Sequence, residues 1–169
     1  MLTACSLRLL ATAEVILVLT ADVVQQQAQW KPSANEWSIA EVLGHLLDEE
    51  RFDFPFRLRS TLEQPDVPLP AIDPEGWVIA HRYNTRDLTE LRAEFVAERK
   101  RSLDWLKQLQ QPNWDTPVNH PHLQGLRAGD LLHAWVGHDL LHIRQINELR
   151  WKWQEQMALP YRLEYAGDW

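Results

Sequence analysis

Apolar residues recur every three or four positions along most of this chain, and no segment keeps the strict alternation typical of a β-strand. Such spacing places the apolar side chains on one face of a helix. It predicts four long helices, over about residues 6–27, 38–61, 85–110 and 127–156. Four long helices in 169 residues predict an all-α fold, a four-helix bundle built as one domain over residues 1–169.

The second predicted helix has the clearest local signals. Ser38 and Glu41 have the spacing of a capping box, in which each side chain satisfies an unpaired backbone N–H of the other residue. Pro55 should kink or interrupt this helix, because proline has no N–H to donate. Irregular segments of more than ten residues follow the second and third helices, so simple antiparallel hairpins are not expected.

Composition narrows the classes of function. The chain is 45% hydrophobic and 24% charged, which is typical of a soluble globular protein. Its formal net charge of -7 argues against a nucleic-acid partner, which would need a basic surface. Cys5 is the only cysteine, so internal disulfides and a cysteine-based zinc site are excluded. We expect a reducing, cytoplasmic location, and any reactive thiol should arrive with a substrate or cofactor.

The N-terminal apolar run, residues 9–21, superficially resembles a secretory signal because it follows Arg8. Glu14 interrupts the run, and no clean cleavage site precedes Asp22. The run is also short for a membrane span. We therefore expect an amphipathic first helix and no membrane association.

Two histidines stand out within the fourth predicted helix. His138 and His142 are four residues apart, so their imidazoles lie one above the other on the same face. Two imidazoles so placed can ligate one divalent metal, and a third ligand is then needed. His45, within the apolar second helix, is the best candidate. Three nitrogen ligands would leave coordination positions open, the pattern of a catalytic zinc site.

Carboxylates near His45 are candidates for a supporting or catalytic role. Asp48 and Glu49 follow it by three and four residues, and either could orient an imidazole or act as a general base. Gln145 follows His142 by three residues and could hydrogen-bond near the site. The remaining histidines lack such support and are expected to be solvated or packing residues: His81, His120, His122 and His133.

Two stretches carry a resemblance to a known family. Residues 35–48, Asn-Glu-Trp-Ser-Ile-Ala-Glu-Val-Leu-Gly-His-Leu-Leu-Asp, resemble the second-helix motif of the DinB/YfiT-like superfamily. Residues 129–146, which end in His-Asp-Leu-Leu-His-Ile-Arg-Gln-Ile, resemble its fourth-helix motif. One departure is Leu141, where many members carry a further histidine.

The resemblance implies an up-down-down-up bundle with long crossover loops, in which His45, His138 and His142 hold zinc, nickel or a similar ion. It also implies a possible homodimer and a small-molecule substrate. We expect metal-dependent transfer chemistry with a low-molecular-weight thiol, because a bound cation stabilises a thiolate. The alternatives are a hydrolase that uses a metal-activated water, with Asp48 or Glu49 as base, and a non-catalytic metal-binding or stress-response protein.

Overall fold

The computed structural model describes residues 1–167. Four long helical segments dominate it: α1 (Leu2–Leu19), the pair α3 (Ile39–Asp48) and α4 (Phe54–Glu63), α6 (Leu88–Leu106) and α7 (Ala128–Ala158). Short elements lie between and after them: α2 (Gln25–Gln29), α5 (Pro74–Ala80) and the 3₁₀ turns η2 (Tyr83–Thr85) and η3 (Glu164–Ala166). No strand forms within residues 1–167, so the predicted all-α class is confirmed.

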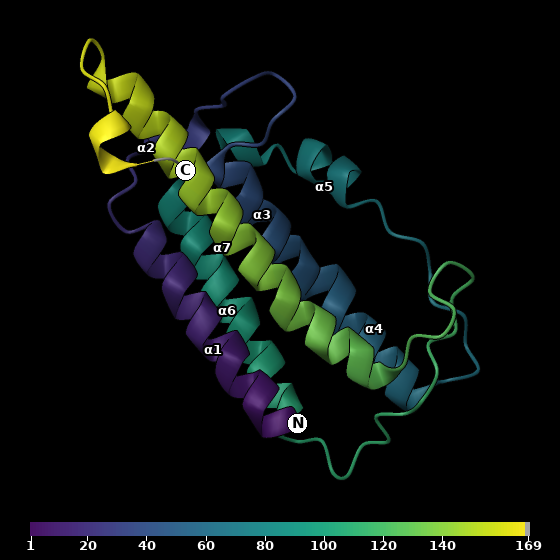
Figure 1. The fold of residues 1–169 in the computed structure, drawn as a ribbon. Coiled ribbons are helices and arrows are strands. Elements are labelled where there is room, and N and C mark those ends of the chain that lie inside the picture. Colours follow the sequence, from purple (N-terminus) through teal and green to yellow (C-terminus); the bar gives the residue numbers. More distant parts are fainter. Residues whose placement is uncertain (168–169) are drawn as a thin grey trace.

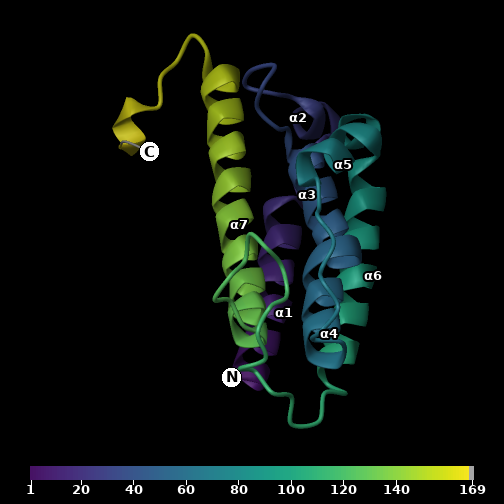
Figure 2. The same cartoon turned by 90° about the vertical axis from the view of Figure 1, so that its right-hand side faces the viewer.

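The four long segments run up, down, down and up, and they form a four-helix bundle (Figures 1 and 2). Two long connections make the parallel middle pair possible. One leads from α4 through α5 back to the start of α6, and the other crosses from the end of α6 to the start of α7. As a result, α3 and α4 lie beside α7 although about 90 residues separate them in sequence. The predicted bundle topology is confirmed.

The second segment begins where the sequence predicts and changes form near its middle. Ser38 accepts a hydrogen bond from the N–H of Glu41, and the Glu41 side chain accepts one from the N–H of Ser38. A π-helical turn, η1 (Glu49–Asp53), then joins α3 to α4 just before Pro55. The π-turn accommodates a proline that cannot donate to the previous turn. It also leaves the consecutive residues Glu49 and Glu50 both buried.

The first helix is shorter than predicted. α1 ends at Leu19 rather than near residue 27, and the separate α2 follows. The reason is a contact from α7: Arg150 donates to the Leu19 carbonyl at 2.6 Å and pairs with Asp22, also at 2.6 Å. Because this cation satisfies the carboxyl end of α1 from another helix, local periodicity could not reveal the end point.

By length and composition α1 could cross a membrane, contrary to the expectation from its sequence. A buried core helix and an N-terminal signal sequence both meet the same criterion, and α1 packs against both α6 and α7. Leu9 and Ile16 of α1 are completely buried. The observation is therefore weak evidence for a membrane role.

A buried polar network joins all four segments at the middle of the bundle. The Arg99 guanidinium of α6 donates to Glu50 of η1 at 2.9 Å and to both oxygens of Asp139 of α7 at 2.7 and 2.9 Å. It also donates to the Leu9 carbonyl of α1 at 2.6 Å. Trp135 and Ser102 donate to Glu50 and Thr12 donates to Asp139, so both carboxylates and the guanidinium are well hydrogen-bonded.

Breaking this network should strongly destabilise the protein. Arg99→Met leaves the Glu50 and Asp139 carboxylates buried without their cation, and we expect a loss of about 3–5 kcal/mol. Urea unfolding followed by circular dichroism measures the change. Arg101→Met, on the exposed side of the same helix, is the matched control and should change stability by less than about 0.5 kcal/mol. A similar small change in both variants would contradict this role for Arg99.

Gly44 gives a second prediction, because α3 passes directly beneath the ring of Tyr83. A β-carbon added at Gly44 would lie 2.1–2.4 Å from three atoms of that ring, which is buried and cannot move aside freely. Gly44→Ala should therefore cost about 1–3 kcal/mol through overpacking. At Gly137, in α7, a β-carbon would meet nothing within 4 Å, so Gly137→Ala should be neutral or stabilising by up to about 1 kcal/mol. Thermal unfolding of the two variants checks the contrast, and equal effects would refute it.

Candidate metal centre

Three histidines converge between α3 and α7, as the sequence predicts. The Nε2 atom of His138 lies 3.1 Å from Nε2 of His45 and 3.1 Å from Nε2 of His142. The ligand atoms of all three residues lie within 4.8 Å of one another. His45 comes from α3, while the other two occupy successive turns of α7, which lies beside it (Figure 1).

The surroundings keep these imidazoles neutral. Burial lowers the pKa of His45 to about 3 and that of His138 to about 4, with the neighbouring histidines contributing in both cases. Burial also lowers the pKa of His142. Aromatic rings cover the cluster: Trp37 lies 5.0 Å from the ring of His45, and Phe54 lies 5.1 Å from the ring of His138. At neutral pH the cluster therefore presents unprotonated imidazoles, the form that binds metals.

One hydrogen bond fixes the protonation of a ring. The Nδ1–H of His142 donates to the side-chain oxygen of Gln145 at 2.7 Å. Since an amide oxygen can only accept, the proton of His142 sits on Nδ1 and its Nε2 keeps a free lone pair. This is the orientation that metal-binding histidines usually have, with the second nitrogen held by a neighbouring group.

Glu49 lies beside His45, as Gln145 lies beside His142. Its Oε1 atom lies 3.7 Å from Nδ1 of His45, slightly beyond hydrogen-bonding distance, and both residues are buried. Burial and the nearby Asp53 carboxylate together raise the pKa of Glu49 to about 9. The carboxyl is therefore protonated at neutral pH when no cation is near, and its predicted catalytic role stays a prediction.

The spacing of the three nitrogens fits a single divalent cation. Two imidazoles about 2.0–2.1 Å from one ion have nitrogens about 2.9 Å apart at a right angle and about 3.4 Å apart in tetrahedral geometry. Both Nε2 separations measured from His138 fall between these values. The residues present therefore fit a zinc- or nickel-like ion.

Asp48 is held by groups outside the histidine cluster. One carboxylate oxygen accepts from the Tyr83 hydroxyl at 2.7 Å, and the other lies 3.0 Å from Nδ1 of His81. These contacts attach η2 and the end of α5 to α3. They give no support to the predicted role of Asp48 as a base, and Glu49 is the better-placed carboxyl.

The other histidines lie apart from the cluster. His120 and His122 sit in the connection between α6 and α7, and His133 is exposed near Cys5, with its Nδ1 3.9 Å from the sulfur. Cys5 itself is a buried residue of the first turn of α1. The sequence analysis did not identify Phe54 as a neighbour of the histidines. It also did not identify the buried charged residues Asp53 and Arg57, although they follow Glu49 at four-residue steps.

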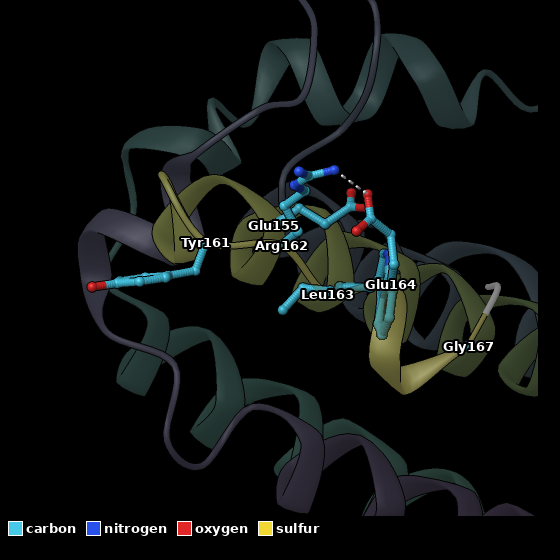
Figure 3. Close-up of a pocket in the computed structure, with 7 residues that line it drawn as sticks. Glu155, Tyr161, Arg162, Leu163, Glu164 and Gly167 are labelled. Carbon is cyan, nitrogen blue, oxygen red and sulfur yellow. Dashed lines mark hydrogen bonds and ion pairs between the residues drawn. The ribbon is translucent and has the colours of Figure 1, made fainter.

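Surface hollows among residues 1–167 include several outside the histidine cluster. One, of about 320 Å³, lies where residues 161–167 fold back beside the end of α7; its Arg162 and Glu164 are paired and Tyr161 points away (Figure 3). A larger groove runs between α1 and α6. The third, of about 290 Å³, adjoins the cluster through Trp37 and Gln145, which contact His45 and His142. It is the hollow best placed to admit a small molecule to the histidines.

Comparisons with known proteins agree with this arrangement. A model of the DinB superfamily matches residues 8–146. Among solved structures, the chain is similar to YfiT from Bacillus subtilis, with a TM-score of 0.79 and 18% sequence identity over 90% of this chain and 87% of that one. YfiT is described as a probable metal-dependent hydrolase with an unusual four-helix bundle topology. A search of curated proteins finds no match.

The hydrogen bond to Gln145 gives a direct test of the centre. Gln145→Ala removes the group that orients His142, and we expect zinc affinity to fall about 10–100-fold with little change in folding stability. Arg144→Ala, one position earlier and exposed, is the matched control and should keep the wild-type affinity. Competition against a zinc chelator measures both variants. Equal zinc affinity in the two variants would contradict a role for Gln145 in supporting the metal site.

Proposed function

Because this chain belongs to the DinB superfamily, we propose that it is an enzyme that uses a divalent metal, held by His45, His138 and His142, to transform a small molecule. The observation that carries the proposal is the convergence of three neutral Nε2 atoms from α3 and α7. Three ligands leave coordination positions open for a reactant. A bound divalent cation supplies Lewis acidity, which lowers the pKa of a coordinated water or thiol and polarises a carbonyl.

The protein's own residues would hold the metal, orient the imidazoles and cover them. Gln145 holds His142 in the tautomer whose Nε2 is free, and Glu49 stands beside the second nitrogen of His45. The rings of Trp37 and Phe54 cover two of the imidazoles and limit the entry of water. Glu49 is also the carboxyl that can give up a proton and take it back, since burial raises its pKa to about 9 and a bound cation would lower that pKa toward neutral pH.

Hydrolysis is the first reaction that we propose. It is supported by the likeness to YfiT, whose description names a probable metal-dependent hydrolase. The site also contains a buried carboxyl, Glu49, whose Oε1 atom lies 3.7 Å from Nδ1 of His45. Esters, amides and lactones are the substrate classes that need a polarised carbonyl and a nucleophilic water.

Thiol S-transfer, which the sequence favours, is the second candidate. Cys5 is buried near the start of α1, and its sulfur lies 3.9 Å from Nδ1 of His133. We therefore assign the attacking sulfur to a low-molecular-weight thiol. In this reaction the thiolate would attack an electrophilic carbon of the substrate and displace a leaving group, which departs with the electron pair of the broken bond.

Several expectations from the sequence remain predictions. These are the identity of the metal, the cytoplasmic location, the absence of nucleic-acid and membrane partners, and the homodimer. The groove between α1 and α6 carries exposed apolar side chains, including Leu7, Leu10 and Val96. Sedimentation of the purified protein would determine the oligomeric state.

Metal content tests the proposal directly. Protein purified without a nickel column should carry about one equivalent of a divalent metal, measured by inductively coupled plasma mass spectrometry, and His142→Ala should lose it. His133→Ala, on the exposed face of the same helix, is the control and should retain the metal. Absence of metal from wild type and His142→Ala alike, even after reconstitution with zinc and nickel, would overturn the proposal.

Two activity screens on the metal-loaded protein separate the reactions. One offers esters, amides and lactones alone, and the other offers a thiol together with electrophiles. Turnover in the first that disappears in His142→Ala supports hydrolysis, and thiol-dependent turnover in the second supports S-transfer. A third outcome would instead support a purely structural ion. In that case the protein holds one equivalent of metal, loses much of its stability when the metal is removed, and shows no turnover in either screen.

A further inference from the structure

His45 and Glu49 carry two buried atoms that complement each other and are both unpaired. The Nδ1 atom of His45 and the Oε1 atom of Glu49 are hidden from solvent, and neither has a hydrogen-bond partner among the described residues. The two atoms lie 3.7 Å apart, on residues separated by about one helical turn. An imidazole N–H donates and a carboxyl oxygen accepts, so each atom is the partner that the other lacks.

The neighbours of His45 leave Glu49 as the acceptor for its Nδ1 atom. The ring of Trp37 lies 5.0 Å from the His45 ring, but an indole nitrogen can only donate. The carboxylate of Asp48 accepts from the hydroxyl of η2 at 2.7 Å and lies 3.0 Å from the imidazole that ends α5. Buried polar atoms without any partner are rare in folded proteins. Glu49 is therefore the group that the structure offers to this nitrogen.

The proposed metal centre requires a proton at Nδ1 of His45. This residue faces the other histidines with its Nε2 atom, which lies 3.1 Å from Nε2 of His138. A neutral imidazole that gives its Nε2 lone pair to a cation carries its proton on Nδ1. In the metal-loaded protein His45 would therefore hold a buried N–H that needs an acceptor. Metal-binding histidines usually meet this need with a carboxylate, a backbone carbonyl or water.

His142 shows the same arrangement in its completed form. Its Nδ1–H donates to the side-chain oxygen of Gln145 at 2.7 Å. The matching separation between His45 and Glu49 is 3.7 Å, which a movement of about 0.7 Å would shorten to an ordinary hydrogen bond. The two ligands thus have supporting groups of the same kind, one in contact and one within a small side-chain movement of contact.

Glu49 lies behind His45 as seen from the histidine cluster. The two nitrogens of an imidazole point away from each other across the ring, and the Nε2 atom of His45 faces the cluster. The Glu49 oxygen beside Nδ1 is therefore placed to act on a metal through the ring of His45. Such a group fixes both the direction of the ring and the nitrogen that carries the proton.

Buried residues further along the helix hold Glu49 in this place. Asp53, about one turn later, interacts with Glu49, and the Arg57 guanidinium donates to Asp53. Arg57 also donates to the Pro70 carbonyl at 3.0 Å, which attaches it to the connection before α5. The three charged side chains are all at least nine-tenths buried. They form a continuous line of contacts that ends at His45.

We propose that Glu49 is the positioning residue of His45, and that its Oε1 atom accepts the Nδ1–H of His45 when a divalent cation occupies the three histidines. The assignment rests on the proposed function, because it needs a metal at the cluster. It gives Glu49 a task that does not require contact with the substrate. It also explains why a carboxyl oxygen is buried beside an unpaired imidazole nitrogen.

Zinc affinity is the first measurement, made by competition against a chelator. Glu49→Leu keeps a side chain of similar size and removes the acceptor, and we expect its zinc affinity to fall about 10–100-fold. Glu49→Gln keeps an acceptor oxygen for His45 and offers its amide N–H to Asp53. Because only the charge of the acceptor is lost, its zinc affinity should fall by less than about tenfold.

Asp48→Asn is the matched control. Asp48 is also buried and directly precedes Glu49, but its carboxylate contacts η2 and the end of α5. The substitution removes a carboxylate from the same neighbourhood and leaves the acceptor for His45 in place. Its zinc affinity should therefore stay close to the wild-type value.

Nuclear magnetic resonance of the zinc-loaded, isotope-labelled protein gives a second readout, which a merely structural role would not change. The Nδ1 proton of His45 should resonate further downfield than that of His142, because a bond to a carboxylate is stronger than a bond to a neutral amide. In Glu49→Gln the His45 signal should move towards the position of the His142 signal. This comparison remains decisive if Glu49→Leu does not fold.

Several results would overturn the proposal. Glu49→Leu or Asp48→Asn would do so if the first bound zinc as tightly as wild type, or if the second weakened binding equally. Glu49→Gln would do so if it bound zinc as weakly as Glu49→Leu, or if its His45 signal stayed unchanged. A wild-type protein that binds no zinc would instead overturn the metal centre, and this inference with it. One equivalent of zinc in wild type, together with any of the earlier results, would reject the role of Glu49 alone.

Discussion

The ion pair between Arg99 and the carboxylates of Glu50 and Asp139 is the interaction on which the rest of the bundle depends. It joins α6 to η1 and α7, and through the Leu9 carbonyl it also reaches α1. Glu50 follows Glu49 in the chain, and Asp139 follows His138. The network therefore fixes the relative height of the two helices that carry the histidines. A displacement of one helical turn, about 5.4 Å, would separate the Nε2 atoms completely.

The π-turn at η1 carries residues that serve both the core and the metal centre. Residues 42–48 of α3 are all buried, and Glu49 and Glu50 continue that buried run into the turn. Glu50 completes the structural network while Glu49 lies beside His45, so a local irregularity connects stability with the site. Irregular turns of this kind are frequent at functional sites.

Much of this organisation could be predicted from the sequence, and the limits have physical causes. The four helices, the Ser38 cap and the three histidines follow from short-range spacing, which a single sequence displays. The end of α1 could not be predicted, because Arg150 determines it from 131 positions away. The Arg99 network also escaped prediction, since 49 and 40 residues separate its partners and no local pattern links them.

The distribution of satisfied and unsatisfied polar groups connects stability with function in this bundle. A buried polar group destabilises a fold unless it has partners, and the Arg99 network supplies them without any ligand. The histidine cluster does not, since Nδ1 of His45 and Nδ1 of His138 have no hydrogen-bond partner. Burial also lowers the pKa of the clustered histidines, so the imidazoles stay unprotonated at neutral pH. A cation held by the Nε2 atoms would use the lone pairs that these imidazoles present. The free energy that the fold gives up at the cluster is then recovered when the cation binds.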